Sequence, residues 1–211
     1  EQSNIIDTKI NEVVGYDTKM KSVTFDKCFM EHTAFPRAEV ENLKIFNVNI
    51  KALKFRGCKI SKSSFNFQGD GISFARSSIS DCIFNGTGSV SWFDFEKVSG
   101  NNIKFDNFND MYSFGFPDAA IDSIEIRNTN ADWVVFYNAK ISNALFENLQ
   151  LVSDRYDGAT LTNCTYRNVV FGEDQSFDST TLESVKFENI TKKTDYKPSF
   201  KETVFKNTER F

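Results

Sequence analysis

The sequence has 211 residues, 40% of them hydrophobic, and its aromatic content comes mainly from 23 Phe against 2 Trp and 6 Tyr. The 25 Lys and Arg and the 29 Asp and Glu give a formal net charge of −4, with both signs mixed along the chain. This balance indicates neither a strongly basic nucleic-acid-binding surface nor a strongly acidic mimic of nucleic acid. Every apolar run is shorter than the roughly 18 to 20 residues that cross a bilayer, so we expect no membrane insertion.

The N-terminal part carries a large apolar residue at every fifth position. This row consists of Met20, Phe25, Met30, Phe35, Val40, Ile45, Ile50, Phe55, Ile60 and Phe65. A second row, two residues earlier in each unit, consists of Val23, Cys28, Thr33, Ala38, Leu43, Val48, Leu53, Cys58 and Ser63. A period of five matches neither the 3.6-residue repeat of a helix nor the two-residue repeat of a strand.

The C-terminal half repeats both rows in another register. The large row consists of Ile121, Ile126, Ala131, Phe136, Ile141, Phe146, Leu151, Tyr156, Leu161, Tyr166 and Phe171. The smaller row consists of Ala119, Ile124, Thr129, Val134, Ala139, Ala144, Leu149, Asp154, Ala159, Cys164 and Val169. Two residues after the large position the chain most often has Asn, Ser or Gly, which tolerate left-handed turn geometry. Each unit therefore reads as a short extended piece with two inward residues around an outward one, followed by a corner.

Shorter runs extend the period over nearly the whole chain. We therefore predict one all-β domain over residues 1–211, with repeats over about residues 18–207 and the flanks as caps. Repeated corners of one hand wind a coil, and neighbouring coils pair as a parallel ladder about 4.8 Å apart. The chain starts at Glu1 without an initiator Met, and we expect it to be a fragment of a larger protein.

These rows resemble the pentapeptide-repeat family, whose unit is a small residue, often Asp or Asn, then Leu or Phe, then two variable positions. The resemblance covers roughly residues 18–207. It departs from the family pattern because the residue before the large one is seldom Asp or Asn; Asn49, Asn102 and Asn107 are among the few candidates. The resemblance implies a right-handed, quadrilateral parallel β-helix with four units per coil, about ten coils and a length of about 45 to 50 Å.

Breaks in the register coincide with the Gly-, Ser-, Asp- or Pro-rich segments NFQGDG, NGTGSVS, DMYSFGFPD, GEDQS and KKTDYKPS, which are typical of loops. The third segment carries Tyr112, Phe114 and Phe116 outside the five-residue register. We expect these rings either to be exposed as anchors for a partner protein or to fold back onto the coil. Trp92 and Trp133 are outward by register and form a second candidate surface, unless they pack over a side face.

The residue types that carry chemistry are sparse. All four cysteines, Cys28, Cys58, Cys82 and Cys164, occupy the small inward row and form no CxxC pair, so we interpret them as buried, reduced spacers in a reducing compartment. His32, the only histidine, falls at a corner with no nucleophile nearby. We predict no catalytic residue, metal site or cofactor in this segment.

A rigid, patterned rod without a pocket favours a non-catalytic role in protein recognition. In style and length the chain also resembles the N-terminal β-helix domain of bacterial HECT-like E3 ubiquitin ligases of the SopA and NleL type, which are secreted into the host cell cytoplasm by type III secretion. That resemblance implies host-protein partners such as RING-bearing or TRIM-type ubiquitin ligases. It also implies a catalytic cysteine beyond Phe211 and contact with an E2 enzyme only through other domains.

Two other functions follow from the same fold class. A DNA-mimicking pentapeptide protein that binds topoisomerase requires a strongly acidic face along the rod, and the interspersed Lys and Arg argue against it. A carbohydrate-active β-helix enzyme requires a cluster of Asp with Arg or Lys on one face, and the sequence shows no such cluster.

Overall fold

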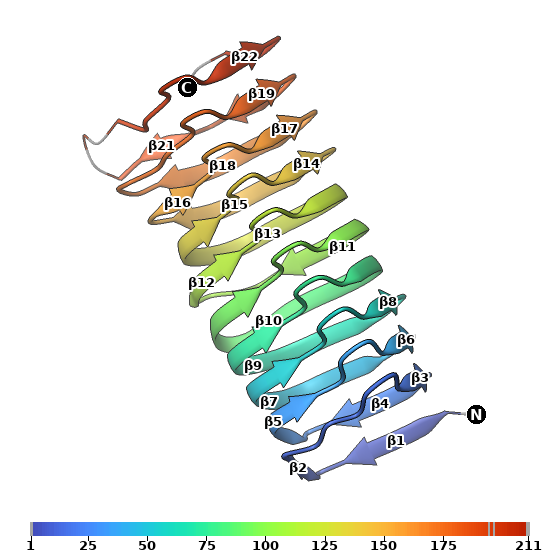
Figure 1. The fold of residues 1–211 in the computed structure, drawn as a ribbon. Coiled ribbons are helices and arrows are strands. Elements are labelled where there is room, and N and C mark those ends of the chain that lie inside the picture. The colour runs from blue at the N-terminus through green and yellow to red at the C-terminus, as the bar shows by residue number, and fades with distance from the viewer. Residues whose placement is uncertain (1, 194, 196, 210–211) are drawn as a thin grey trace.

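The chain forms a single continuous β-solenoid in the computed structural model, which describes residues 2–193, 195 and 197–209. Successive turns stack along one axis from the N-terminal to the C-terminal end (Figure 1). Every strand pairing in the described part is parallel, and no helix forms there. The described residues therefore offer no helix that is long and apolar enough to span a membrane.

The strands are short because the backbone changes direction at each corner. In chain order they are β1 (Ser3–Ile6), β2 (Lys9–Asn11), β3 (Lys19–Lys21), β4 (Val23–Asp26), β5 (Phe29–Ala34), β6 (Glu39–Glu41), β7 (Lys44–Lys54), β8 (Lys59–Ser61), β9 (Ser64–Ser73), β10 (Ser78–Asp94), β11 (Ser99–Asp106), β12 (Met111–Gly115), β13 (Ala120–Val135), β14 (Lys140–Ser142), β15 (Leu145–Leu151), β16 (Asp154–Arg155), β17 (Thr160–Thr162), β18 (Thr165–Phe171), β19 (Thr181–Glu183), β20 (Lys186–Glu188), β21 (Thr191–Lys192) and β22 (Val204–Lys206). The longest, β10 and β13, continue around corners from one side to the next.

Four five-residue units complete one regular turn, as the resemblance to pentapeptide repeats implies. Along one side the inward residues follow one another in the order Met20, Val40, Ile60, Ile79, Gly100, Ile121, Ile141, Leu161, Leu182 and Phe205. The described part thus winds about ten turns. This confirms the predicted all-β, four-sided parallel β-solenoid of about ten turns.

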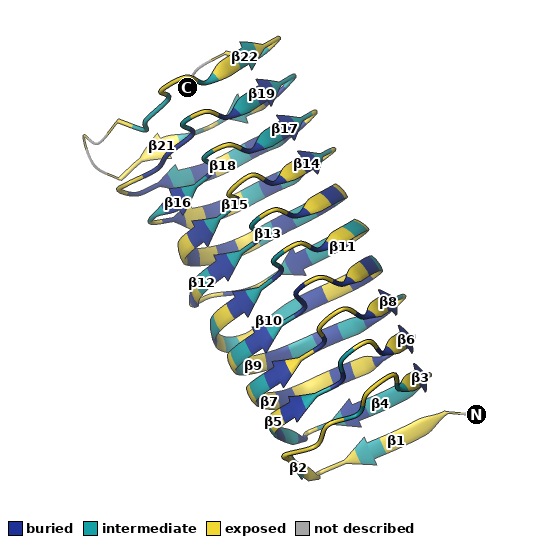
Figure 2. Cartoon of the chain, viewed as in Figure 1, coloured by how far each residue is buried: buried dark blue, intermediate teal, exposed yellow. Residues whose placement is uncertain are grey.

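The interior is filled by the two predicted rows. In most units two buried residues flank a more exposed one, as Ala139 and Ile141 flank Lys140, and bands of buried and exposed residues alternate along the strands (Figure 2). On one side the large row is a continuous pile of rings, with neighbouring centroids 4.5 to 5.5 Å apart: Phe35, Phe55, Phe74, Phe95, Phe116, Phe136, Tyr156, Phe177 and Phe200. This stacking explains the high Phe content, because one flat ring is repeated at the spacing of the turns.

The corners are left-handed, as the Asn, Ser and Gly residues indicate. Asn128, Asn148, Asn168 and Asn189 all have φ between 48° and 56°. Their side chains form a ladder in which each Nδ2 donates to the Oδ1 of the residue one turn earlier at 3.0 Å. Asn is favoured here because it tolerates positive φ and, stacked, satisfies its own amide groups.

The DMYSFGFPD segment differs from the prediction. It is not a loop, because β12 continues the solenoid and pairs with β10 and β13. The irregularities in the ladder are shifts of register between Ile45 and Val48 and between Gly86 and Val90. The solenoid also begins before the predicted repeat region, because β1 and β2 already pair with β4 and β5.

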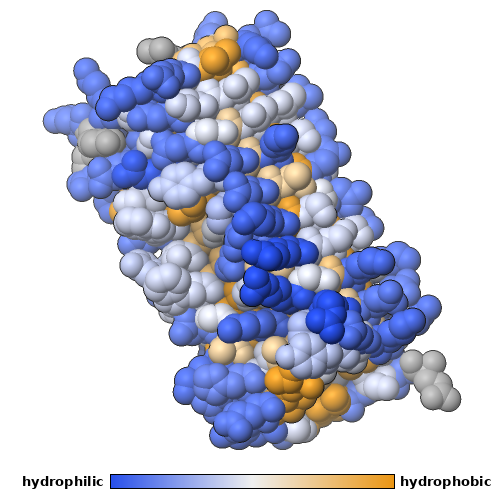
Figure 3. Space-filling view, in the orientation of Figure 1, coloured by the Kyte–Doolittle hydropathy of each residue, from blue (hydrophilic) through white to orange (hydrophobic). Residues whose placement is uncertain are grey.

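The outward residues are mostly polar and pair along the axis. Glu147 lies within 3.4 Å of Arg127 and 3.2 Å of Arg167, and Arg167 lies 2.8 Å from Glu188. Hydrophilic side chains cover most of the visible face, and a patch of apolar surface lies near the N-terminal turn (Figure 3). Because cations and anions alternate along this row, they form no acidic stripe.

Candidate functional site

Both tryptophans lie at left-handed corners of the solenoid. Trp92 has φ 54° and Trp133 has φ 61°, and their side chains are 61% and 51% exposed. Positive φ is shared by the other corners, most of which carry polar residues, so the exposed indole rings are what distinguishes these two corners. The corner between them along the axis carries Ser113, which has φ 56°. The corner itself therefore does not require a ring.

Tyr112 lies on the turn between the two tryptophans. Register places Tyr112 beside Ser91 on one side and Asp132 on the other, which are the residues that precede Trp92 and Trp133. The Tyr112 ring is 48% exposed and meets the Trp92 ring edge to face, with centroids 6.2 Å apart. We refer to Trp92, Tyr112 and Trp133 as the aromatic corner.

Phe114 and Phe116 do not belong to this surface, and the expectation that they are exposed is wrong. Phe114 is 1% exposed and Phe116 is 0% exposed. The reason is register: the two residues lie five positions before Ala119 and Ile121 and therefore start the C-terminal rows one unit earlier. Phe116 stacks between Phe95 and Phe136 in the interior pile.

Two further exposed apolar side chains, one four residues after Trp133 and one on the following turn, were not predicted. Tyr137 and Val152 are both exposed. Each directly follows a large inward residue, Phe136 or Leu151, so the rule that the next residue points outward was sufficient to find them. Exposed apolar side chains gathered on consecutive turns are typical of interaction sites rather than of a solvated rod.

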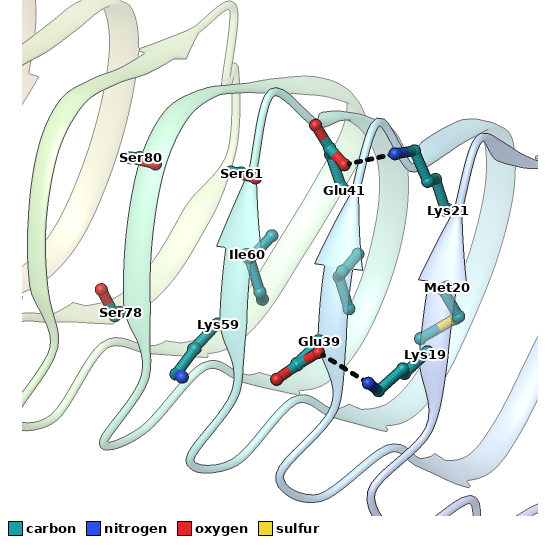
Figure 4. A pocket seen from close by; sticks show the side chains of 11 residues that line it. Lys19, Met20, Lys21, Glu39, Glu41, Lys59, Ile60, Ser61, Ser78 and Ser80 are labelled. Carbon is teal, nitrogen blue, oxygen red and sulfur yellow. Dashed lines mark ion pairs between the residues drawn. The ribbon is translucent and has the colours of Figure 1, made fainter.

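A shallow hollow of about 380 Å³ lies on another side of the N-terminal turns (Figure 4). Its two edges are rows of charged residues, in which Lys19 pairs with Glu39 at 3.6 Å and Lys21 pairs with Glu41 at 3.3 Å. These ion pairs neutralise the charges that line the hollow. Its described lining holds Lys, Glu, Ser and apolar side chains but no histidine or cysteine.

The cysteines and the histidine lie where the sequence predicts. All four cysteines are buried and free, and burial raises the pKa of both Cys82 and Cys164 to about 11, so these thiols stay protonated. His32 is exposed at a corner with φ 47°. Among the described residues, no group of three or more His, Cys, Asp or Glu is arranged to hold a metal ion.

One acidic group lies inside the solenoid. Asp154 is fully buried, and burial raises its pKa to about 7. A raised pKa in a cleft often marks a catalytic acid. Here the carboxyl group is closed off from solvent on every side, so no substrate reaches it. Asp154 is therefore a feature of the interior and not part of a reaction site.

No protein-family model matches the sequence, and no curated protein matches it either. Solved structures with a similar fold include the A-module of the mannuronan C-5 epimerase AlgE6 of Azotobacter vinelandii, with 12% identity over 99% of this chain and 80% of that chain and a TM-score of 0.44. The pentapeptide repeat protein HetL of the cyanobacterium Nostoc sp. strain PCC 7120 matches with 10% identity over 96% of this chain and 87% of its own, at a TM-score of 0.33.

A trypsin-treated form of QnrB1, a plasmid-mediated fluoroquinolone resistance protein, matches with 16% identity over 89% of this chain and 92% of its own, at a TM-score of 0.34. At these identities the three similarities concern the fold alone. The function of the chain therefore has to be argued from its own surface.

Proposed function

We propose that the chain is a non-catalytic recognition module that binds a partner protein through the aromatic corner. The observation that carries this proposal is the placement of both tryptophans, exposed and at left-handed corners, on either side of the exposed Tyr112. Trp and Tyr are the residues most enriched at the centres of protein interfaces, because they bury a large area at a small cost in conformational entropy. The rigid solenoid lowers the entropic cost of binding further, because its surface needs no ordering when a partner binds.

The resemblance to HECT-like ligases extends the proposal to a partner and a compartment. In this form, the module selects host proteins, such as RING-bearing or TRIM-type ubiquitin ligases, for a secreted bacterial E3 ubiquitin ligase in the host cytoplasm. The four buried, reduced thiols are compatible with a reducing cytosol. They are also inaccessible as nucleophiles, so ubiquitin transfer would require a cysteine outside this segment.

Affinity capture from host cytosol, followed by mass spectrometry, tests both the docking role and its extension to a ubiquitin ligase. The wild-type module is compared with a variant that carries Trp92→Ser, Tyr112→Ser and Trp133→Ser. Ser is suitable because Ser113 already occupies an equivalent corner, so the far-UV spectrum should not change. A variant with Phe46→Ser and Ile83→Ser, which removes two exposed apolar side chains elsewhere, is the matched control.

We expect the triple variant to lose partners that the control variant retains. Equal capture by all three proteins would show that the aromatic corner is not the docking surface. Ubiquitin-system proteins among the partners lost would support the ligase form of the proposal. If the corner binds partners that are all unrelated to ubiquitin transfer, the docking role stands and the ligase form is wrong.

A further inference from the structure

Within the four turns that carry the aromatic corner, the charged residues on this side are all acidic, and cations are aligned with them only on the flanking turns, at Lys51, Lys54 and Arg155. The segments that form this part of four consecutive turns are residues 68–73, 89–94, 110–115 and 130–135, and they are aligned by the strand register. They contain four acidic residues, Asp70, Asp94, Asp110 and Asp132, and no Lys or Arg. The first cation on this side is Lys51 of the preceding turn, which is aligned with Asp70 and forms an ion pair with Glu31 at 2.7 Å.

Two of these carboxylates lie directly beside the rings. Asp132 is aligned with Tyr112 and precedes Trp133, while Asp70 is aligned with Ser91, which precedes Trp92. Both carboxylates are exposed, and neither forms an ion pair or a side-chain hydrogen bond with another described residue. Each tryptophan thus has a carboxylate within about one turn, or about 5 Å along the axis. Asp132 has no Lys or Arg in the aligned position of the preceding turn, whereas Asp70 is aligned with Lys51, whose ammonium group pairs with Glu31.

The other two carboxylates are held in place by neighbouring turns. Asp94 accepts a hydrogen bond from the Ser73 hydroxyl at 2.9 Å and from the Glu96 amide at 2.8 Å. Asp110 accepts one from the Ser89 hydroxyl at 2.6 Å. These donors are neutral, so they orient the two carboxylates and leave their charges uncompensated.

Aromatic faces interleaved with free carboxylates match the chemistry of guanidinium and ammonium groups. The face of a Trp or Tyr ring attracts a cation, and a carboxylate next to the ring forms an ion pair with the same group. An acidic segment would be repelled by four like charges. The backbone in these turns is already paired on both sides, so a ligand cannot add to the ladder as a further strand and has to bind through its side chains.

We propose that the ligand of the aromatic corner is a partner segment rich in Arg and Lys, bound in an extended conformation across Trp92, Tyr112 and Trp133. This inference rests on the docking role proposed above and specifies the class of partner. The two tryptophans are two turns apart, about 10 Å, which an extended or polyproline-II segment spans in about three residues. Two cationic side chains at that spacing would each meet one indole ring and its neighbouring carboxylate.

The test uses a synthetic peptide of about eight residues in which Arg recurs at every third position, with Gly and Ser between. A matched peptide has Glu in place of each Arg. Binding is followed by the fluorescence of the two tryptophans, which are the only indoles in the chain. We expect the Arg peptide to change the emission and the Glu peptide not to. The apparent Kd should rise severalfold between about 50 and 300 mM NaCl, because exposed charge pairs are screened.

Two variants separate the effect of the carboxylates beside the rings from the effect of the net charge of the rod. Asp70→Asn with Asp132→Asn should weaken binding of the Arg peptide by about fivefold or more, because each lost pair contributes a few-fold in affinity. Glu39→Gln with Glu41→Gln, which removes two carboxylates from a different side of the rod, is the matched control and should leave the Kd unchanged. An equal loss in both variants would mean that only the net charge matters and would overturn the proposal.

Other outcomes also decide the question. Emission changes with the Glu peptide, or salt-independent changes with a neutral probe such as maltoheptaose, would overturn the proposal in favour of an acidic or a carbohydrate ligand. If the aromatic corner captures host proteins but the Arg peptide does not bind, the basic-segment inference fails and the docking role stands. If the triple Ser variant also captures every partner of the wild type, the docking role itself fails.

Discussion

Asp154 is aligned with Val134 of the preceding turn and takes the same inward position in the solenoid. Its carboxylate is fully buried, and neither oxygen makes a hydrogen bond of normal geometry with the described residues. The Gln175 amide and the Tyr156 hydroxyl lie near enough to oppose the rise in the Asp154 pKa, but burial outweighs them. An ionisable side chain thus occupies a position that the preceding turns fill with the apolar residues Ile72, Phe93, Phe114 and Val134.

This burial predicts a stability that depends on pH. With a pKa of about 7 in the folded chain and the usual 3.8 in the unfolded chain, Asp154 keeps its proton when folded and loses it on unfolding between these values. Unfolding then releases a proton, so the free energy of unfolding falls as the pH rises from about 4 to about 7 and levels off above that. The total loss is on the order of 4 kcal/mol.

Urea titrations of the wild type and of Asp154→Asn, at pH values from about 4 to 8, measure this effect. We expect the variant to gain stability relative to the wild type as the pH rises, because its amide does not ionise. Asp132→Asn, which changes an exposed carboxylate, is the control and should follow the wild type. A stability difference between Asp154→Asn and the wild type that is constant over this range would show that Asp154 titrates normally.

Removing one ring from the interior should be costly. Phe146 is buried and stacks on Tyr166 with ring centroids 4.4 Å apart. Phe146→Ala should lower the free energy of unfolding by about 3 to 5 kcal/mol, because the rigid turns above and below cannot close the cavity. Phe46→Ala removes the same ring from an exposed position and should cost less than about 1 kcal/mol. Similar costs for both, measured by chemical denaturation, would contradict the assigned interior.

The Asn ladder allows a test of the corners. Asn148 has φ 56°, donates to Asn128 and accepts from Asn168. Asn148→Ala loses both hydrogen bonds and places a Cβ residue without compensation in the left-handed region, which should cost about 1 to 2 kcal/mol. Asn148→Gly loses the same hydrogen bonds, but Gly adopts positive φ readily, so the loss in stability should be smaller than for Ala. A thermal melt in which Gly destabilises more than Ala would rule out backbone conformation as the reason for Asn.

The thiols should be unreactive in the folded chain. Cys82 and Cys164 are buried, with pKa values raised to about 11, and the Cys58 thiol donates to the carbonyl of Phe35 at 2.9 Å. An aromatic disulfide reagent at pH 8 should therefore react slowly with the native protein and rapidly with all four thiols in denaturant. Fast reaction of a thiol in the native protein would show that its turn opens readily.

Much of the fold could be predicted from the sequence because the repeat is local. Each five-residue unit carries its own inward pair and its own corner. The sequence therefore predicts the rows through Ile141 and Phe146, and the corners at Asn143 and Asn148, without knowledge of the neighbouring turns. The outward position of Trp92 and Trp133 follows from the same rule. Phe114 and Phe116 were misjudged because a Gly, a Pro and several rings in one segment resemble a loop, although its spacing still matches the following row.

The arrangement of the surface was decided only by the tertiary structure. Tyr112 is 20 residues from Trp92 and 21 from Trp133, and the three become neighbours only because each turn has its particular length. A single residue added to or lost from a turn shifts every following pair, so the sequence rows alone do not say which corner lies above which. The same register gathers Asp70 and Asp132 beside the rings and leaves Asp154 unpaired inside. The sequence by itself therefore determines the coil, and the stacking of its turns determines what the coil presents to a partner.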